Sequence, residues 1–326
     1  MTVLQPRAYT EPSRRYGAHE NASMRIQSSH WPVRALAFAA AFTAAGLVRP
    51  SVSATQAGDR ERTLFVSAVD DKGQPVSGLG AEDFVVREDG VRREVLRVSR
   101  AIEPIDIALL VDNSASADEA VVSMRDGLRR FVETMAGPHQ IAIIALADRP
   151  TILVDYTTDK TRLEAGIGRI FSQPQSGMTM LDAIVEVSQG LRKREASRAV
   201  IVPVINDGIE FTNRHSRDVL ESVRRAGASL HAVTIGAFYV SVDDVDRERA
   251  LVLDTVTRDT GGQRITLLNH SAIRDALARL AAELSSQYKV VYGRPQSLIP
   301  PDAVAVSSGR PGVTMRAAPM RGQPGA

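Results

Sequence analysis

The sequence predicts an α/β fold with a doubly wound, mainly parallel sheet, accompanied by a small β-sandwich-like companion. Two observations carry this prediction. Apolar runs of strand length alternate with amphipathic helical stretches between residues 105 and 292, and short strand-like segments lie on both sides of that alternation. Strands that are apolar on both faces need helices on both sides of the sheet, which is the layout of a doubly wound fold.

The first 54 residues have the layout of a secretory signal peptide. An apolar run at residues 35–48 follows two Arg residues, and a small-residue pattern ends at Ala54. Because the run is shorter than the ~20 residues that span a bilayer, we expect cleavage near Ala54 and a secreted or periplasmic protein with no stable membrane span. A retained N-terminal anchor and a buried Ala-rich helix are the alternatives, and the start of the chain is either Met1 or Met24.

Residues 60–103 form the first part of the β companion. A strand is expected at 63–69, and strands at 84–87 and 91–98 flank Asp89-Gly90. Asp-Gly favours a tight two-residue turn because both central positions need positive φ. A block of about 40 residues is too small to build a core alone, so we expect it to pair with another part of the chain.

Residues 104–291 contain the alternation itself. Strands are expected at 105–111, 140–147, 199–205 and 230–235, with a final one at 287–292. Helices are expected at 119–135, 159–170, 181–194, 216–226, 247–260 and 271–285. In such sheets the carboxyl ends of the parallel strands share one edge, and ligands bind there.

The C-terminal residues complete the expected β companion. Two short strands, at 303–306 and 312–316, make the segment 292–316 a β tail that we expect to pack on the N-terminal block. Residues 317–326 hold Pro, Gly and few large apolar side chains, so we expect them to be disordered.

The net charge of +2 and the pI of about 9.0 would suit a protein that binds nucleic acid. Residues 1–54, however, carry six Arg and two Glu, and residues 293–326 carry four Arg and one Asp. The middle of the chain is therefore net acidic, which argues against nucleic acid as a partner. Cys is absent, which excludes disulfides, Cys-ligated zinc and thiol nucleophiles.

Oxygen-bearing side chains gather in three loops at the predicted carboxyl edge of the sheet. Asp112, Ser114 and Ser116 follow the strand at 105–111, and Asp207 follows the strand at 199–205. Thr179 precedes the helix at 181–194. Hydroxyl and carboxylate oxygens suit a hard divalent cation such as Mg²⁺. A set with so few carboxylates leaves the cation short of negative charge, so it would seek an Asp or Glu carboxylate from a protein partner. Mn²⁺ and Ca²⁺ stay open because oxygen ligands serve all three ions.

These residues resemble the metal-ion-dependent adhesion site of von Willebrand factor A domains. The resemblance covers roughly residues 104–291, where 177–183 is similar to the family's threonine loop and 206–208 to its aspartate loop. The flanks, residues 66–98, 287–292 and 304–316, are similar to those of a bacterial secreted subgroup that is abundant in acidobacteria.

The resemblance implies a role for each residue of the predicted site. Ser114, Ser116 and Thr179 would contact the metal, whereas Asp112 and Asp207 would act mostly through bound waters. The family usually has Gly and Met at the positions of Ala115 and Ala117. Ala adopts positive φ less readily than Gly, so a slightly altered loop and a weakened site are expected consequences.

Other interpretations of these residues exist. Asp112 could be only a helix N-cap, since Asp favours that position. Asp243, Asp244 and Asp246 form an acidic loop that offers a second place for Ca²⁺, with a solvated loop as the default. No nucleophile elbow and no phosphate loop occurs in the sequence, so we expect no enzymatic activity.

Three functions are consistent with the sequence. The first is metal-dependent adhesion or assembly through an acidic residue of a protein partner. The second is a structural scaffold in a cell-envelope complex, with metal binding incidental. The third is a metal-assisted hydrolase.

Overall fold

The computed structural model describes residues 61–236, 244–294, 301 and 303–318, all of them within one compact unit, Ala54–Ala326. The predicted signal segment, residues 1–54, and residues 319–326 of the predicted tail lie outside the described residues. In the described ranges, no helix has the length and apolarity that a membrane crossing requires.

A seven-stranded sheet lies at the centre of the α/β part, and it confirms the predicted doubly wound architecture. Its strand order is β11-β10-β8-β5-β6-β7, with β9 also paired to β8. All pairs are parallel except β6 with β7. The strands are β5 (Asp106–Val111), β6 (Gln140–Ala145), β7 (Thr151–Thr157), β8 (Ala199–Asn206), β9 (Ala228–Leu230), β10 (Ala232–Ile235) and β11 (Arg264–Leu267).

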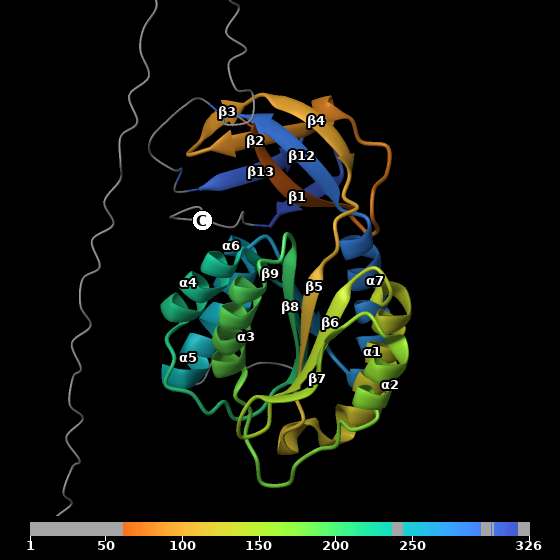
Figure 1. The fold of residues 1–326 in the computed structure, drawn as a ribbon. Coiled ribbons are helices and arrows are strands. Elements are labelled where there is room, and N and C mark those ends of the chain that lie inside the picture. The colour runs from red at the N-terminus through yellow and green to blue at the C-terminus, as the bar shows by residue number, and fades with distance from the viewer. Residues whose placement is uncertain (1–60, 237–243, 295–300, 302, 319–326) are drawn as a thin grey trace, which may run out of the picture. The chain divides into compact units, whose positions relative to one another are not determined.

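Helices cover both faces of this sheet, as its apolar strands require (Figure 1). On one face lie α1 (Val121–Met135), α2 (Lys160–Ile167) and α7 (Ile273–Ser285). On the other lie α3 (Met180–Arg194), α4 (Ser216–Ala226) and the helical run α5 (Asp244–Leu251), η4 (Val252–Val256) and α6 (Thr257–Asp259). Each face has its own apolar core, and residues of β8 contribute to both.

The structure corrects the strands of the predicted alternation at four places. The strand expected at 230–235 is divided into β9 and β10. β7 and β11 are edge strands that the sequence analysis missed, because neither contains a continuous apolar run. The final strand of the predicted alternation is β12 (Tyr288–Gly293), which pairs with strands of the β part instead of the parallel sheet. An apolar run of strand length does not specify which sheet the strand joins.

The β part consists of two antiparallel sheets, in the orders β14-β1-β12-β4 and β13-β2-β3. Its other strands are β1 (Glu61–Asp70), β2 (Phe84–Glu88), β3 (Val91–Arg93), β4 (Val95–Arg100), β13 (Val304–Ser308) and β14 (Val313–Ala317). The C-terminal strands therefore pair with the N-terminal block as predicted. Ala317, expected in the disordered tail, is the last residue of β14.

One core holds the two sheets of the β part together. It includes Leu64, Phe84 and Tyr292, and the buried Glu88 carboxylate accepts hydrogen bonds from the Tyr292 hydroxyl at 2.8 Å and from Arg93 Nε at 2.9 Å. The β2–β3 hairpin turns at Asp89 and Gly90, whose φ angles of 47° and 81° are the positive values that the Asp-Gly pair predicts.

Two glycines of the α/β part test how closely its elements pack. A methyl group at Gly262 would lie 1.8 Å from the Leu230 carbonyl oxygen, which is fixed backbone, so Gly262→Ala should lower the free energy of unfolding by about 2 kcal/mol or more. Gly190, inside α3, has open space around its Cα. Gly190→Ala should raise the free energy of unfolding by about 0.5–1 kcal/mol, because Ala favours the helix. Urea unfolding of both variants measures the difference, and equal effects would contradict the packing.

Candidate metal centre

The centre of the site is the carboxylate of Asp112, which follows β5 and is fully buried. Its Oδ1 accepts a hydrogen bond from the Ser114 backbone N–H at 2.9 Å, and its Oδ2 accepts one from Asn206 N–H at 3.0 Å. Burial raises the pKa of Asp112, while these donors oppose that shift. The bond to Asn206 crosses from β5 to β8, so Asp112 does more than cap a helix.

The two serines of the first loop bring their hydroxyls together. Ser114 Oγ and Ser116 Oγ are 2.9 Å apart, and Ser116 Oγ lies 3.5 Å from Asp112 Oδ2. Neighbouring oxygen ligands of an octahedral Mg²⁺ are about 3.0 Å apart, because each metal–oxygen bond is about 2.1 Å long. Ser114 is buried and Ser116 is exposed, so the pair opens onto the surface.

The alanines of this loop do not strain it. Ala115 and Ala117 lie in a short 3₁₀ helix, η3 (Ala115–Ala120), and neither is among the residues with positive φ. The conformation adopted here is open to any residue, so the loop requires no glycine at these two positions. A weakened metal site stays a prediction.

The aspartate loop approaches the serines through Gly208. A methyl group at Gly208 would lie 2.2 Å from Ser116 Oγ, so only a hydrogen atom fits between the two loops. Asn206 Nδ2 donates to the Ser116 carbonyl at 2.8 Å, which agrees with its predicted role in shaping the loop. Its Oδ1 is buried without a hydrogen-bond partner among the described residues, which leaves one acceptor unsatisfied beside the serines.

Thr179 is held in a different way. It precedes α3, and both its backbone N–H and its hydroxyl donate to the Leu146 carbonyl, at 2.9 and 2.8 Å. Leu146 and Ala147 in turn donate to Oδ1 of Asn113, the residue after Asp112. Within the described ranges, no hydrogen bond joins Thr179 directly to Asp112 or to the serines. The hydroxyl oxygen of Thr179 keeps its lone pairs for a further interaction.

Asp207 is exposed and faces a positively charged side chain of the same chain. Its Oδ1 lies 3.5 Å from Nη2 of Arg249, a buried residue of α5 that the sequence analysis did not identify. Partial burial raises the pKa of Asp207, and the guanidinium acts in the opposite direction. Among the described residues, no hydrogen bond connects the Asp207 side chain to Asp112 or to the serines.

The residues present fit a hard divalent cation. Asp112, Ser114 and Ser116 are joined by hydrogen bonds, Gly208 closes on them, and Asn206 Oδ1 is an unsatisfied acceptor beside them. In the part of the chain that the structure describes, no three His, Cys, Asp or Glu side chains gather at one point. A cation at this edge would therefore be held largely by hydroxyl oxygens.

Glu210 is a second residue that the sequence analysis missed. It is 4% exposed, its Oε1 accepts from Leu181 N–H in the first turn of α3 at 3.0 Å, and its Oε2 has no hydrogen-bond partner among the described residues. Burial raises the pKa of Glu210 to about 8, so the carboxyl group is mostly protonated at pH 7. Its neighbours in sequence, Ile209 and Phe211, are 69% and 53% exposed.

This alternation places two apolar side chains on the surface beside the site. The segment is tied to the threonine loop by Met178 N–H donating to the Ile209 carbonyl at 2.8 Å and Phe211 N–H donating to the Met178 carbonyl at 2.7 Å. Gly177 lies against the Phe211 ring, which a side chain at position 177 would displace. Ile209 and Phe211 also line a surface hollow of about 720 Å³ that includes Arg214 and Asp182.

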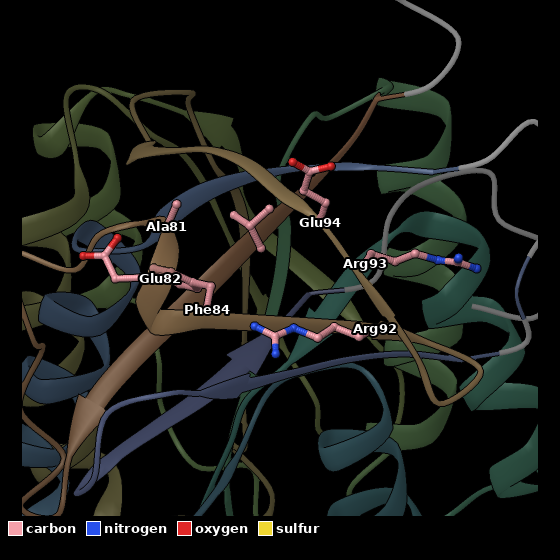
Figure 2. A pocket seen from close by; sticks show the side chains of 7 residues that line it. Ala81, Glu82, Phe84, Arg92, Arg93 and Glu94 are labelled. Carbon is pink, nitrogen blue, oxygen red and sulfur yellow. The ribbon is translucent and has the colours of Figure 1, made fainter.

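Another hollow, of about 490 Å³, lies on the β part and is lined by Phe84 and by charged residues of both signs (Figure 2). Arg92 and Arg93 point in opposite directions there, as consecutive strand residues do. Guanidinium and carboxylate groups share the lining, so this hollow favours no single class of ligand, and the loops at the carboxyl edge of the sheet remain the stronger site.

Residues 107–209 match the family model of the von Willebrand factor type A domain. The match supports the von Willebrand factor A family. It covers about a third of the chain and contains all five residues of the predicted site, so it concerns the α/β part and leaves the β part aside. No curated protein matches the chain.

Three solved structures illustrate what this chain is similar to. One is a von Willebrand factor type A protein from Catenulispora acidiphila, with 11% identity, 76% of each chain covered and a TM-score of 0.46. Another is the vWF domain of the type V pili tip protein Mfa5 from Porphyromonas gingivalis, with 12% identity, 56% of this chain and 96% of that one covered, and a TM-score of 0.45. A third is proximal thread matrix protein 1 from the mussel byssus with a zinc-occupied MIDAS motif, with 14% identity, 61% and 50% covered, and a TM-score of 0.44.

The buried carboxyl of Glu210 leads to a prediction on stability. The folded chain holds this proton up to about pH 8, whereas an unfolded Glu releases it near 4.5. Stability from this group is therefore present at low pH and is lost as the pH rises across that window. Glu210→Gln keeps an acceptor for Leu181 without the ionisation, so its stability relative to wild type should increase between pH 5 and pH 8 by on the order of 1–3 kcal/mol.

Urea unfolding at several pH values tests this prediction. Glu119→Gln, which changes an exposed carboxylate at the start of the same domain, is the matched control and should run parallel to wild type. If the free energies of unfolding of Glu210→Gln and wild type also change in parallel from pH 5 to pH 8, the Glu210 carboxyl group is not protonated in the folded chain over that range.

Proposed function

We propose that this chain is a divalent-cation-dependent protein-binding protein, acting in adhesion or assembly. The cation, Mg²⁺ in the first instance, would be held by Asp112, Ser114, Ser116, Thr179 and Asp207, and it would capture an Asp or Glu side chain of a protein partner. The observation that carries this proposal is the pair of serine hydroxyls, 2.9 Å apart, held over the buried Asp112 carboxylate and open to solvent at Ser116.

The charges of the site support an acidic partner. Of the five residues, only two carry carboxylates, and one of these, Asp112, is buried with a raised pKa. A cation with two positive charges would therefore be incompletely neutralised by the side chains around it. A carboxylate from another protein supplies the missing charge and an oxygen of the kind that Mg²⁺ prefers.

The exposed apolar side chains beside the site support a protein as the partner. Ile209 and Phe211 follow Asp207 by two and four residues and present their side chains to solvent. A metal–carboxylate contact ringed by apolar area gains both direction and buried surface, and aromatic side chains are frequent anchors of such interfaces.

The proposal extends to location and family subgroup. The signal-like segment at residues 1–54 supports a secreted or periplasmic protein, and the flanking β strands resemble the bacterial secreted subgroup of von Willebrand factor A proteins. We propose binding rather than catalysis, since the sequence contains neither a nucleophile elbow nor a phosphate loop.

A structural scaffold is the second candidate, and one observation favours it. The Thr179 hydroxyl donates to the Leu146 carbonyl, and Asp207 pairs with Arg249, so both loops have partners within the chain. In a scaffold of this kind the loops would keep their shape, and the partner its affinity, with no cation bound.

Cation titration distinguishes the two candidates. Mg²⁺ binding, measured by calorimetry, should be lost in Asp112→Ala, because that change removes the charge beneath the serines. Gly208→Ala should weaken it at least about tenfold, since the new methyl group collides with Ser116. Gly190→Ala, in open space on α3, is the matched control and should bind as wild type does. Partner capture that survives both EDTA and Asp112→Ala would favour the scaffold.

The apolar rim makes a separate prediction. Phe211→Ser removes an exposed ring from the surface beside the site, so partner capture should fall about tenfold or more while Mg²⁺ affinity stays at the wild-type value. Ile102→Ser changes an apolar residue that is even more exposed than Phe211, at 86% against 53%. It lies before β5, at the opposite end of that strand from Asp112, and its change should leave capture unchanged. Equal capture by the two variants would exclude Phe211 from the interface.

A further inference from the structure

Arg249 is a buried charged residue that links helix α5 to the aspartate loop. Its side chain is 4% exposed. The guanidinium lies 3.5 Å from Asp207 Oδ1 and 3.1 Å from Asp246 Oδ1, and its Nη1 donates a hydrogen bond to the Gly208 carbonyl. One planar group thus engages both residues of the loop that approaches the serines.

These contacts restrict the loop in two ways. The guanidinium lies 3.5 Å from Oδ1 of Asp207, an ion-pair distance that favours an orientation of the carboxylate with this oxygen toward Arg249. The bond to the Gly208 carbonyl holds the backbone where Gly208 closes against Ser116, with no room for even a methyl group. A guanidinium has a rigid fork of donors, so it can hold both groups at once, which a single ammonium group cannot do as well.

A positive charge near a cation site would ordinarily repel the cation. Here Asp246 lies closer to the guanidinium than Asp207 does, at 3.1 Å against 3.5 Å. Arg249 and Asp246 therefore form a pair with no net charge, and the field of such a pair falls off faster with distance than that of a lone charge. The effect of Arg249 on the site is then mainly one of geometry.

We propose that Arg249 is a positioning residue of the metal centre: it orients the Asp207 carboxylate and holds Gly208 against Ser116, so that the aspartate loop is in place before a cation arrives. This inference rests on the proposed function, because it assumes that the site binds a cation. Groups that orient metal ligands from behind typically contribute 10–100-fold in metal affinity.

The test is a double variant that keeps the net charge. Asp246→Asn with Arg249→Met removes one charge of each sign. A change in the affinity for the cation therefore reports the loss of the guanidinium donors of Arg249. Mg²⁺ binding measured by calorimetry, and Mn²⁺ binding measured by the electron paramagnetic resonance signal of the free ion, should both weaken by about 10–100-fold.

The chain offers a matched control on the same helix. Asp244 and Arg247 form an exposed ion pair with the same three-residue spacing, at 2.6 Å. Asp244→Asn with Arg247→Met makes the same chemical change on the solvent side of α5, and its affinity for Mg²⁺ and Mn²⁺ should equal that of wild type.

Thermal unfolding in EDTA shows whether the variants fold. If the double variant does not fold, Arg249→Lys replaces it, since Lys retains the charge without the fork and should also bind the ions more weakly than wild type. A folded variant with a lower unfolding temperature and unchanged ion affinity would overturn the inference and leave the metal site intact. A wild-type chain that binds neither ion would overturn the proposed function and this inference together.

Discussion

The carboxylate of Asp112 is the contact on which the geometry of the site depends. It lies where β5 ends and accepts hydrogen bonds from the backbone of both Ser114 and Asn206, so it joins the first loop to the end of β8. β5 and β8 are adjacent parallel strands in the middle of the sheet. Because their apolar residues are buried on both faces, the strands cannot shift relative to each other without losing both cores, and the loops inherit that rigidity.

The β part is attached at the amino end of β8, whereas the site lies at the carboxyl end of that strand. Arg198, which precedes β8, donates to Gln287 Oε1 at 2.6 Å, and Gln287 Nε2 donates to Ser67 Oγ on β1 at 3.0 Å. Burial lowers the pKa of Arg198 to about 10, which still leaves it charged at neutral pH. The predicted ligands lie beyond the carboxyl ends of β5 and β8, so attachment of the β part leaves that edge of the sheet uncovered (Figure 1).

The sequence predicted the central strands, the helices and the position of the three loops, because these follow from apolar periodicity and from the rule that parallel strands end on one edge. Arg249 and Glu210 had no comparable signal. Arg249 reaches Gly208 across 41 residues, a contact that exists only once α5 packs beside the aspartate loop. Glu210 is an ordinary loop carboxyl in the sequence, and its burial follows from the backbone bonds that tie its neighbours to Met178. β7 and β11 were not predicted, because strands at the edge of a sheet need no continuous apolar run.

Each carboxylate of the site is held by donors that the chain itself supplies. Two backbone N–H groups hold Asp112, and the Arg249 guanidinium faces Asp207, so neither carboxylate depends on a cation to keep its place. The loops can then form before a cation binds, and binding need not be coupled to folding as it is in small metal-dependent domains. The residues that would hold a cation at this preformed site are rich in hydroxyl groups, and one of them, Ser116, is exposed to solvent. That combination agrees with the proposed contact to a carboxylate of a protein partner, since few charged side chains of the chain itself would neutralise the cation.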